Sequence, residues 1–323
     1  MTRYARQMIL PEIGAAGQAT LAAAHVVVIG AGGLGCPVLQ YLAGAGVGRL
    51  TIFDPDTVEE SNLHRQPLYR MADLGRPKAE AARDALRALN PQIAVEAHVE
   101  AVGPRRAETI ATEADLVIDA ADSFAVSYIL SDACLRAQTP LISASVLGQT
   151  GYVGGFCAWA PSLRAVFPDL PASGASCATA GVLGPVVGVI GALQAQIALR
   201  VLLGADPPAL GRMLTADLAE LRFGAFSFLG TPEPERPLPF VSVEMLSEGD
   251  LVVDLRGEDE APKPICAAAV RLSGSELAAL EPASGQRVVL CCASGLRAWQ
   301  AARNLQIRCA GAEVELLATK TGW

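Results

Sequence analysis

The feature that most constrains this chain is a run of four β-branched residues that leads into a glycine-rich turn and then into a helical pattern. The run covers residues 26–29, and the turn Gly30-Ala31-Gly32-Gly33-Leu34-Gly35 follows it directly. This order predicts a buried strand, a tight turn and the start of a helix. Glycines let the backbone approach an anion closely, and the unpaired N–H groups at a helix start attract phosphate. We therefore expect a phosphate-binding turn made by Gly30, Gly32, Gly33 and Gly35.

A second predicted strand, residues 50–53, ends at Asp54, about 20 residues beyond the glycine turn. A carboxylate at this place can accept hydrogen bonds from the ribose hydroxyls of a nucleotide. The motif therefore indicates a nucleotide, and it leaves open whether the ligand is a dinucleotide or ATP. The alternative is a tight strand-to-helix turn that binds nothing.

Strand and helix patterns alternate from residue 26 to about residue 140. The predicted strands are 26–29, 50–53, 93–98, 115–119 and 141–144, and the predicted helices lie near 37–43, 78–89 and 124–137. Such alternation implies right-handed crossovers, and hence an α/β fold with a doubly wound, mostly parallel, Rossmann-like sheet that is covered by helices on both faces. Functional groups should then collect where the strands end.

The composition of the sequence changes after residue 148. Glycine-rich strands near residues 151–158 precede a loop rich in Ser, Gly and Ala at 171–180, and a long helix begins near Pro185. Four prolines within residues 231–239 predict an extended linker. We therefore predict a first domain at 1–230, the proline-rich linker at 231–239, and a small α/β domain at 240–323 with strands at 251–255 and 288–291 and a helix at 296–307.

Charge and composition argue against several classes of protein. The chain of 323 residues has a net charge of −8 and no run of basic residues, so we expect no nucleic-acid partner. The first residues contain no apolar export signal. The apolar stretch that starts at residue 181 is interrupted by Gln194, Gln196 and Arg200, which favours a buried helix over a membrane span. We expect a cytoplasmic protein with no membrane partner.

Polar residues follow the predicted strand ends or precede the predicted helices. They are Asp54, Asp56, Ser61, Asn62, Arg65, Lys78, Asp122 and Ser123. Each has an ordinary structural explanation when taken alone, for example Arg65 and Lys78 as solvated charges and Asp122 as a helix cap. Together they provide what the activation of a triphosphate needs: fixed cations, a carboxylate for Mg²⁺ and amides at a helix start.

Five motifs occur in order: Arg3-Tyr4-x-Arg6-Gln7, the glycine turn, Asp-x-Asp-x-Val-x-x-Ser-Asn-Leu-x-Arg-Gln from Asp54, Gly-x-Pro-Lys ending at Lys78, and the segment 176–185. This set resembles the adenylyltransferases of the ubiquitin-activating-enzyme superfamily that activate ubiquitin-like sulfur carriers for molybdopterin synthase and for thiamine biosynthesis. The resemblance covers most of residues 1–230. It implies that the C-terminal glycine of a carrier ending in Gly-Gly attacks the α-phosphate of ATP, which gives an acyl-adenylate and pyrophosphate.

The same resemblance assigns roles to individual residues. The residues implied to contact ATP are Asp54 at the ribose and, around the phosphates, Gly33, Asn62, Arg65 and Lys78, with Asp56, Ser61 and Ser123 in the same site. Asp122 is implied to hold Mg²⁺. Arg6 is implied to reach the ATP of the partner subunit in a homodimer, and the alternative for Arg6 is an ordinary interface salt bridge.

Two departures from the family pattern matter. The residue after Asp122 is Ser123, where the family usually has Asn. Many members hold a structural zinc ion with two C-x-x-C pairs, whereas none of the eight cysteines here has that spacing. The place of the first pair is Ser162-Leu163-Arg164-Ala165, and that of the second falls in the linker. We therefore expect no zinc site.

Two cysteines are candidates for sulfur chemistry. Cys177 lies in the loop before Pro185, and the resemblance implies that it forms an acyl or persulfide link to the carrier. The alternative is a small loop residue without chemistry. Cys292 ends a predicted buried strand and is followed by Gly295, Arg297 and a helix start. Backbone amides in such a loop lower the pKa of a thiol and hold a persulfide anion.

The loop of Cys292 has the pattern C-x-x-G-x-R, which resembles a rhodanese sulfurtransferase domain. This resemblance implies that Cys292 carries sulfane sulfur and that Arg297 supports its charge. Residues 262–266 differ from the stretch that rhodaneses commonly show. The alternative is a degenerate domain that only packs against the first.

We therefore expect an enzyme that adenylates the carrier with Mg-ATP. A persulfide on Cys292, or Cys177, would then pass sulfur on to give a thiocarboxylate for thiamine or molybdenum cofactor biosynthesis, and a cysteine desulfurase or thiosulfate would supply that sulfur. One alternative is a tRNA-modifying dehydratase of the same superfamily. A nicotinamide dehydrogenase is another, although no acid or base for hydride transfer is evident. The last is a scaffold that binds nucleotide or carrier without turnover.

Overall fold

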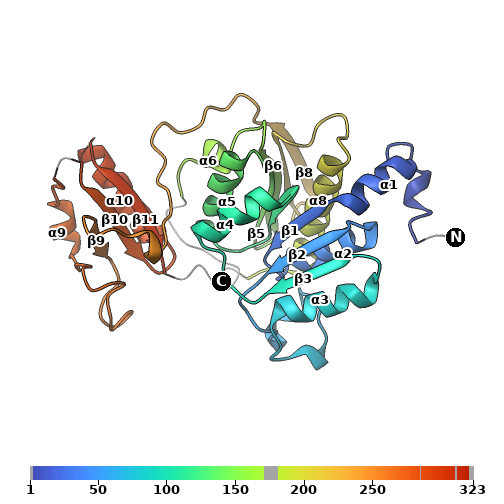
Figure 1. Ribbon diagram of the computed structural model, residues 1–323, viewed down its shortest axis with the longest axis horizontal. Coiled ribbons are helices and arrows are strands. Elements are labelled where there is room, and N and C mark those ends of the chain that lie inside the picture. The colour runs from blue at the N-terminus through green and yellow to red at the C-terminus, as the bar shows by residue number, and fades with distance from the viewer. Residues whose placement is uncertain (1–2, 171–180, 284, 310, 320–323) are drawn as a thin grey trace.

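The computed structural model describes residues 3–170, 181–283, 285–309 and 311–319, which form two separate sheets with their helices (Figure 1). The larger sheet has eight strands in the order β3-β2-β1-β4-β5-β6-β7-β8, and the smaller has three in the order β11-β10-β9. The larger sheet is built from residues before the proline-rich linker and the smaller one from residues after it.

The larger sheet is parallel over five strands and antiparallel over three. The parallel strands are β1 (His25–Ile29), β2 (Arg49–Phe53), β3 (Ala94–His98), β4 (Leu116–Asp119) and β5 (Pro140–Leu147). The antiparallel extension consists of β6 (Thr150–Cys157), β7 (Arg212–Asp217) and β8 (Arg222–Ser227). β1 pairs with β2 on one side and with β4 on the other. The strand order therefore reverses at β1, which makes its carboxyl end the topological switch point where α/β sheets bind ligands.

Helices cover both faces of the larger sheet, in agreement with the prediction. They are α2 (Gly35–Ala45), α3 (Lys78–Leu89), α4 (Pro104–Glu113), α5 (Phe124–Ala137), α6 (Leu163–Val166) and α8 (Gly184–Leu202), with α1 (Gly14–Ala23) before β1. Short 3₁₀ helices occupy Gln7–Ile9, Glu60–Asn62, Met71–Asp73 and Val243–Met245. The sequence analysis missed α4, because its buried stripe consists only of Ala107, Ile110 and Ala111.

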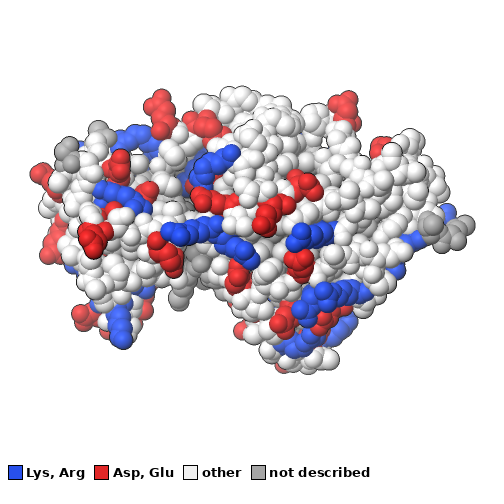
Figure 2. All heavy atoms as spheres, viewed as in Figure 1, with Lys and Arg blue, Asp and Glu red and all other residues white. Residues whose placement is uncertain are grey.

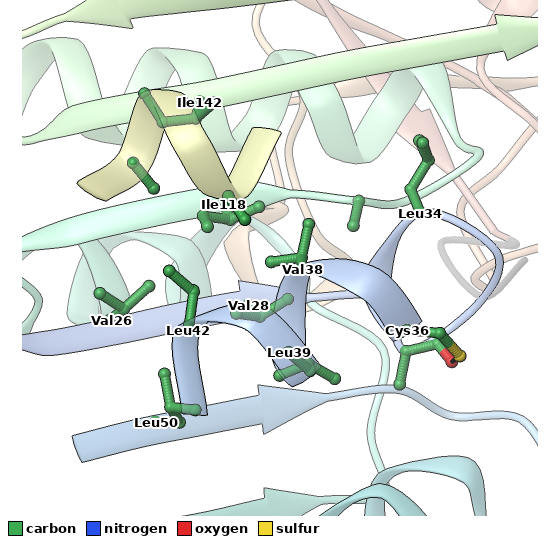
Figure 3. Close-up of a cluster of buried hydrophobic side chains, with 14 of the residues drawn as sticks. Val26, Val28, Leu34, Cys36, Val38, Leu39, Leu42, Leu50, Ile118 and Ile142 are labelled. Atoms are coloured by element: carbon green, nitrogen blue, oxygen red, sulfur yellow. Dashed lines mark hydrogen bonds between the residues drawn. The ribbon is translucent and has the colours of Figure 1, made fainter. Parts of the chain in front are cut away.

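The side chains of β1 alternate between two cores. Val26 and Val28 pack on the face covered by α2, whereas Val27 and Ile29 belong to the cluster on the opposite face. Figure 3 shows Val26 and Val28 beside Leu39 and Leu42 of α2. A strand that is buried on both faces needs a continuous apolar run, which explains the four β-branched residues before the glycine turn. These two cores fix the carboxyl end of β1 between its neighbours.

The long apolar helix predicted near Pro185 is α8. It is the one helix among the described residues that is long and apolar enough to cross a membrane by length and composition. In this fold it packs against α2, β5 and β6, and Val186, Val187, Ile190 and Ala198 are buried. This helix is therefore part of the core of the larger sheet, as the sequence analysis expected.

The smaller sheet is parallel throughout. Its strands are β9 (Leu251–Asp254), β10 (Arg287–Cys292) and β11 (Glu313–Ala318), and its helices are α9 (Gly274–Ala278) and α10 (Leu296–Arg308). The sequence analysis predicted β9, β10 and α10 but missed β11. Residues 231–239 contain no helix or strand. They are held in place, because Glu233 accepts hydrogen bonds from Ser162 and Arg236 donates to the carbonyls of Gln306 and Ala312.

Charged side chains of opposite sign are interspersed on the face that Figure 2 shows. Several of them form surface ion pairs, such as that of Arg76 with Asp73 and Asp84. Exposed pairs of this kind contribute little to stability.

Candidate active site

A cavity of about 700 Å³ opens at the carboxyl ends of the parallel strands, beside the glycine turn. It lies at the switch point between β1 and β4. Nine of the residues predicted to bind ATP line it: Gly32, Gly33, Asp54, Asp56, Asn62, Arg65, Lys78, Asp122 and Ser123. The fold therefore brings together residues that are spread over about a third of the chain. Gly30, Gly35, Ser61 and Arg6 do not line the cavity.

The four glycines of the turn divide into two pairs. Gly30 has φ of +98°, and a Cβ there would lie 2.6 Å from the carbonyl oxygen of Ala120. A Cβ at Gly35 would overlap the carbonyl of Gly30. Gly30 and Gly35 therefore give the turn its shape beneath the cavity, while Gly32 and Gly33 face the ligand space.

Asp54 holds the glycine turn against the end of β2. Its carboxylate accepts hydrogen bonds from the backbone N–H of Ala31 at 2.7 Å and of Asp56 at 2.9 Å. Burial raises the pKa of Asp54, while the nearby Lys78 ammonium and the two N–H donors oppose that rise. Asp54 thus has a structural role in addition to the ribose contact that the sequence analysis predicts for it.

Lys78 begins α3 and reaches back into the cavity. It is 6% exposed, and its Nζ lies 2.9 Å from Oδ2 of Asp56. Tyr69 links this helix start to the glycine turn, because its hydroxyl lies 2.7 Å from the carbonyl oxygen of Ala31 and 3.3 Å from that of Lys78. Tyr69 was not predicted. Its position just past the Arg65-Gln66 motif was the only available signal.

The segment that follows β2 supplies a second cation. Asn62 is buried, and its side-chain oxygen caps the 3₁₀ turn by accepting from the N–H of Glu59. Arg65 donates to the carbonyl of Ser61 at 3.1 Å, and no acidic partner for it is found among the described residues. Ser61 itself is exposed and hydrogen-bonds Glu59. Arg65 is therefore a cation at the cavity wall whose charge is available to an anionic ligand.

Asp122 and Ser123 form the opposite wall, between β4 and α5. Asp122 is open to water on the cavity side, yet protein surrounds it on the other sides, and this burial raises its pKa. The charge of Asp56 adds to the rise, and Lys78 and Arg65 oppose it. Two carboxylates whose charges repel across a cavity are a fitting environment for Mg²⁺, which binds through one or two carboxylates, phosphate oxygens and water. The described residues contain no cluster of three or more His, Cys, Asp or Glu side chains that could hold a metal without a ligand's help.

Several residues of the cavity were missed by the sequence analysis. Gln66 is 3% exposed, and its Oε1 has no partner among the described groups. Tyr128, Tyr152 and Phe167 form an aromatic wall on the side of β6 and α6. Aromatic residues in apolar segments look like core residues in a sequence, so no pattern distinguished these three.

The structure places Arg6 at the far end of α2 from its own cavity. Its neighbour Gln7 donates to the carbonyl of Ala45 at 2.8 Å, and Tyr4 accepts from Asn90 at 2.8 Å. The cavity lies at the start of α2, and the eleven residues of this helix span about 16 Å. Any contact of Arg6 with ATP would therefore have to be made in a second subunit. Cys177 lies outside the described residues.

Polar contacts occupy the place where the family resemblance locates the first zinc-binding pair. The N–H and the hydroxyl of Ser162 donate to the carboxylate of Glu233, at 2.7 and 2.5 Å. Arg164 is 5% exposed and donates two hydrogen bonds to Asp132. These contacts join the end of β6 to α5 and to the linker.

Cys292 lies at the carboxyl end of β10 with its sulfur among backbone amides. The N–H of Gly295 lies 3.2 Å from the sulfur and that of Ala298 lies 3.4 Å from it. Cys292 is fully buried, and Arg297 beside it is paired with Glu260. Burial raises the pKa of the adjacent Cys291 to about 12. The two amides lie where the sequence analysis expects N–H groups around this sulfur, and the analysis made no prediction about its burial.

A doubly wound sheet with a cation-lined cavity at its switch point defines a nucleotide-binding α/β protein. The model of the ThiF family matches residues 4–238, and this chain belongs to the ThiF family. The matched part ends before the first strand of the smaller sheet.

The names of similar proteins agree with the family assignment. A sulfur carrier protein adenylyltransferase of Thermus thermophilus is 46% identical over 231 residues, which are 69% of this chain and 85% of the relative. An adenylyltransferase and sulfurtransferase MOCS3 of Bos taurus is 46% identical, and the match covers 67% of this chain but only 48% of the relative. A SAMP-activating enzyme E1 of Haloferax volcanii is 38% identical over 72% of this chain and 87% of the relative. These relatives confirm the expectation of an adenylyltransferase enzyme.

Solved structures share the fold of the larger domain. The E. coli MccB structure with ATP matches 72% of this chain and 72% of its own, with a TM-score of 0.62 and 24% identity. The E. coli MccB structure with MccA-N7isoASN covers 72% of this chain and 74% of its own, with a TM-score of 0.64 and 25% identity. These likenesses confirm the predicted class of mostly parallel, doubly wound α/β sheet.

Proposed function

We propose that this chain uses Mg-ATP to adenylate the C-terminal glycine of a ubiquitin-like sulfur-carrier protein that ends in Gly-Gly. The observation that most directly supports this is that Arg65, Lys78 and Asp122 line one cavity with the glycine turn. A carboxylate oxygen of the carrier attacks the α-phosphorus, the bond from that phosphorus to the bridging oxygen breaks, and pyrophosphate leaves. The names of the relatives from Thermus thermophilus and Bos taurus support the same reaction.

The residues of the cavity would position the phosphates and stabilise charge. The amides around Gly32 and Gly33 hold phosphate oxygens, and Lys78 and Arg65 stabilise the negative charge that grows on the α-phosphate and on pyrophosphate. Asp122, with Asp56 across the cavity from it, would hold Mg²⁺. When bound, the ion would supply positive charge to the phosphates and help to orient them.

The proposed enzyme is a cytoplasmic homodimer in which Arg6 serves the partner subunit's site. Arg6 is exposed and lies far from the cavity of its own chain. An additional cation that enters from a second subunit would complete the charge around the triphosphate.

Sulfur transfer is the proposed second step. A persulfide on Cys292 attacks the acyl carbon with its terminal sulfur, and AMP leaves. The thiolate of a second cysteine, for which Cys177 is the candidate, then attacks the sulfur atom of Cys292. The S–S bond of the acyl disulfide breaks, the thiocarboxylate leaves, and a disulfide between Cys177 and Cys292 remains, which an external thiol reduces before the next turnover. The amides of Gly295 and Ala298 around the sulfur of Cys292 support this role, and so does the position of Arg297. The product would serve thiamine or molybdenum cofactor biosynthesis.

Carrier-dependent exchange of labelled pyrophosphate into ATP tests the adenylation step. The protein is incubated with Mg-ATP and purified thiamine-type or molybdopterin-type carriers, each compared with the same carrier lacking its terminal Gly-Gly. We expect exchange with at least one intact carrier and none with the truncated forms. A correctly folded protein that binds ATP but gives no exchange with either carrier would instead indicate a non-catalytic scaffold.

Labelling with radioactive sulfane sulfur tests the second step. Thiosulfate, or cysteine with a cysteine desulfurase, is offered to the protein, and the persulfide is located by mass spectrometry. We expect the label on Cys292 and its loss in Cys292→Ala. Cys309→Ala is the matched control, because Cys309 lies in the same domain at the end of α10 and is only partly buried. Full labelling of Cys292→Ala would show that the assignment is wrong.

A further inference from the structure

One wall of the cavity contains none of the residues that are predicted to bind phosphate. This aromatic wall consists of Tyr128, Tyr152 and Phe167. The rings of Tyr152 and Phe167 lie 5.1 Å apart, and the hydroxyl of Tyr128 donates to the carbonyl of Phe167 at 2.6 Å. The three residues therefore hold one another and come from three elements or loops: α5, β6 and the segment after α6.

Arg164 lies directly behind the aromatic wall. Its guanidinium carbon is 4.6 Å from the centre of the Tyr128 ring. The same guanidinium donates to both carboxylate oxygens of Asp132, at 2.6 and 2.9 Å, and to the carbonyl of Leu238 at 2.9 Å. Arg164 is 5% exposed, so its charge depends on these partners instead of on water. A planar guanidinium can make all of these contacts at once, which a lysine ammonium cannot.

The contact with Leu238 connects the aromatic wall to the second domain. The residues that follow Leu238 join the smaller sheet, because Leu316 of β11 donates to the carbonyl of Pro239 at 2.9 Å and Val241 donates to the carbonyl of Leu316 at 2.7 Å. Phe240 packs closely on Gly295: a Cβ atom added to Gly295 would lie 2.6 Å from the ring of Phe240. A shift of the second domain would therefore move the carbonyl that Arg164 holds.

An independent contact links the same two parts. Asp169 lines the cavity near Phe167, and its carboxylate lies 3.1 Å from the guanidinium of Arg303 on α10. Leu170 and Trp299 belong to one buried cluster with Leu238 and Phe240. The second domain thus contacts the rim of the cavity at Asp169 and the back of the aromatic wall through Arg164.

The aromatic wall is suited to contact the peptide of the carrier, which bears the attacking carboxylate. The cations Arg65 and Lys78 come from the β2 side of the cavity, and the leaving pyrophosphate belongs there. In an in-line displacement the attacking carboxylate approaches from the side opposite to the leaving group. The peptide attached to that carboxylate then lies toward the aromatic wall.

We propose that Arg164 is a positioning residue that couples the docking of the second domain to the aromatic wall, and thereby sets the affinity of the site for the acyl substrate. The assignment of that substrate rests on the proposed function. The coupling itself does not, because it concerns only contacts within this chain.

Two measurements on the full chain test this proposal. Hydrogen exchange followed by mass spectrometry reports on α5, on residues 163–170 and on the linker, and carrier-dependent pyrophosphate exchange gives kcat and KM. For Arg164→Lys we expect faster hydrogen exchange in all three segments and a KM for the carrier that rises about tenfold, with the KM for ATP and kcat changed less than about twofold. Phe240→Ala, which leaves Arg164 intact, should reproduce both effects by loosening the second domain.

Arg308→Met is the matched control, because the acceptors of Arg308 among the described residues are the carbonyls of Leu277 and Leu280, which follow the linker as Arg308 does. It should leave both measurements unchanged. Unchanged hydrogen exchange at residues 163–170 in Arg164→Lys would overturn the coupling, as would faster exchange with an unaltered KM for the carrier. A wild-type protein without pyrophosphate exchange would refute the proposed function, while the hydrogen-exchange comparison would still decide the coupling.

Discussion

The charged side chains that line the cavity interact electrostatically with one another. Lys78 is buried and paired with Asp56. Burial raises the pKa of Asp122, and the charge of Asp56 adds to that rise. Arg65 has no acidic partner among the described residues. An incoming triphosphate with Mg²⁺ would satisfy all of these groups at once. Such preorganised charge is the main source of rate in phosphoryl transfer.

Replacement of Lys78 by Met should therefore lower the rate of pyrophosphate exchange by about 10²–10³. The effect should fall mainly on kcat, because the cation matters most where charge develops. Arg49→Met is the control, since Arg49 forms an exposed pair with Glu96 at the opposite end of β2. Equal rates for Lys78→Met and the wild type would remove Lys78 from the mechanism.

Asp119 offers a test of electrostatics in the folded state. It ends β4 and is fully buried, where it accepts from Ser143 at 2.7 Å and from the N–H of Ala121 at 3.2 Å. Burial raises the pKa of Asp119 from 3.8 to about 6. Between these values the folded chain keeps a proton that the unfolded chain has released, so stability falls as pH rises through this window and levels off above it.

Asp119→Asn should remove this dependence. The difference in free energy of unfolding between the variant and the wild type should grow by up to about 1.4 kcal/mol per pH unit between pH 4 and pH 6, in favour of the variant, and then stay constant. Urea unfolding at closely spaced pH values measures it. A constant difference across the whole range would show that Asp119 ionises normally in the fold.

At the scale of elements, the glycines of α2 show how this helix packs against the glycine turn. The helix begins at the glycine turn and ends at Ala45, and the next residue, Gly46, has φ of +84°, the left-handed conformation typical of the position after a helix. Two glycines of this helix differ in their surroundings. Gly35 is packed against the carbonyl of Gly30, whereas Gly44 has open space where a side chain would be.

Gly35→Ala should therefore lower the free energy of unfolding by several kcal/mol, on the order of 2–4. Gly44→Ala in the same helix should raise it by up to about 1 kcal/mol, because alanine reduces the freedom of the unfolded chain. Thermal and urea unfolding of both variants provide the comparison. Similar losses in both variants would mean that the close approach of the turn to α2 is not what requires Gly35.

Whether a helix or strand could be predicted from the sequence depended on how its buried residues are arranged. The predicted helices at 78–89 and 124–137 coincide with α3 and α5, because each begins next to a motif. α3 carries a clear apolar face, and α5 is apolar and buried over most of its length. β8 was missed because all of its residues are exposed, and α4 because its buried residues are few. The sequence located the cations by motif, whereas the aromatic wall and Tyr69 carried no motif of their own.

At the scale of the whole molecule, the position of Arg6 makes the quaternary structure testable. Mixing Arg6→Ala with Lys78→Met allows dimers with one variant of each kind. If Arg6 acts in the partner's site, one of the two sites in each mixed dimer contains both residues. Random reassortment should then restore about a quarter of the wild-type exchange rate. No recovery after verified subunit exchange would place Arg6 in a purely structural role.

The sequence by itself determined the alternating strands and helices, the glycine turn and most of the polar residues that line the cavity. It could do so because these features depend on neighbours within one element or one turn. Only the tertiary structure decided that Gly30 and Gly35 lie beneath the cavity while Gly32 and Gly33 line it, that Arg6 lies away from its own site, and that Arg164 connects the second domain to the aromatic wall. Those relations depend on which segments pack together across long stretches of chain, and local spacing does not encode them.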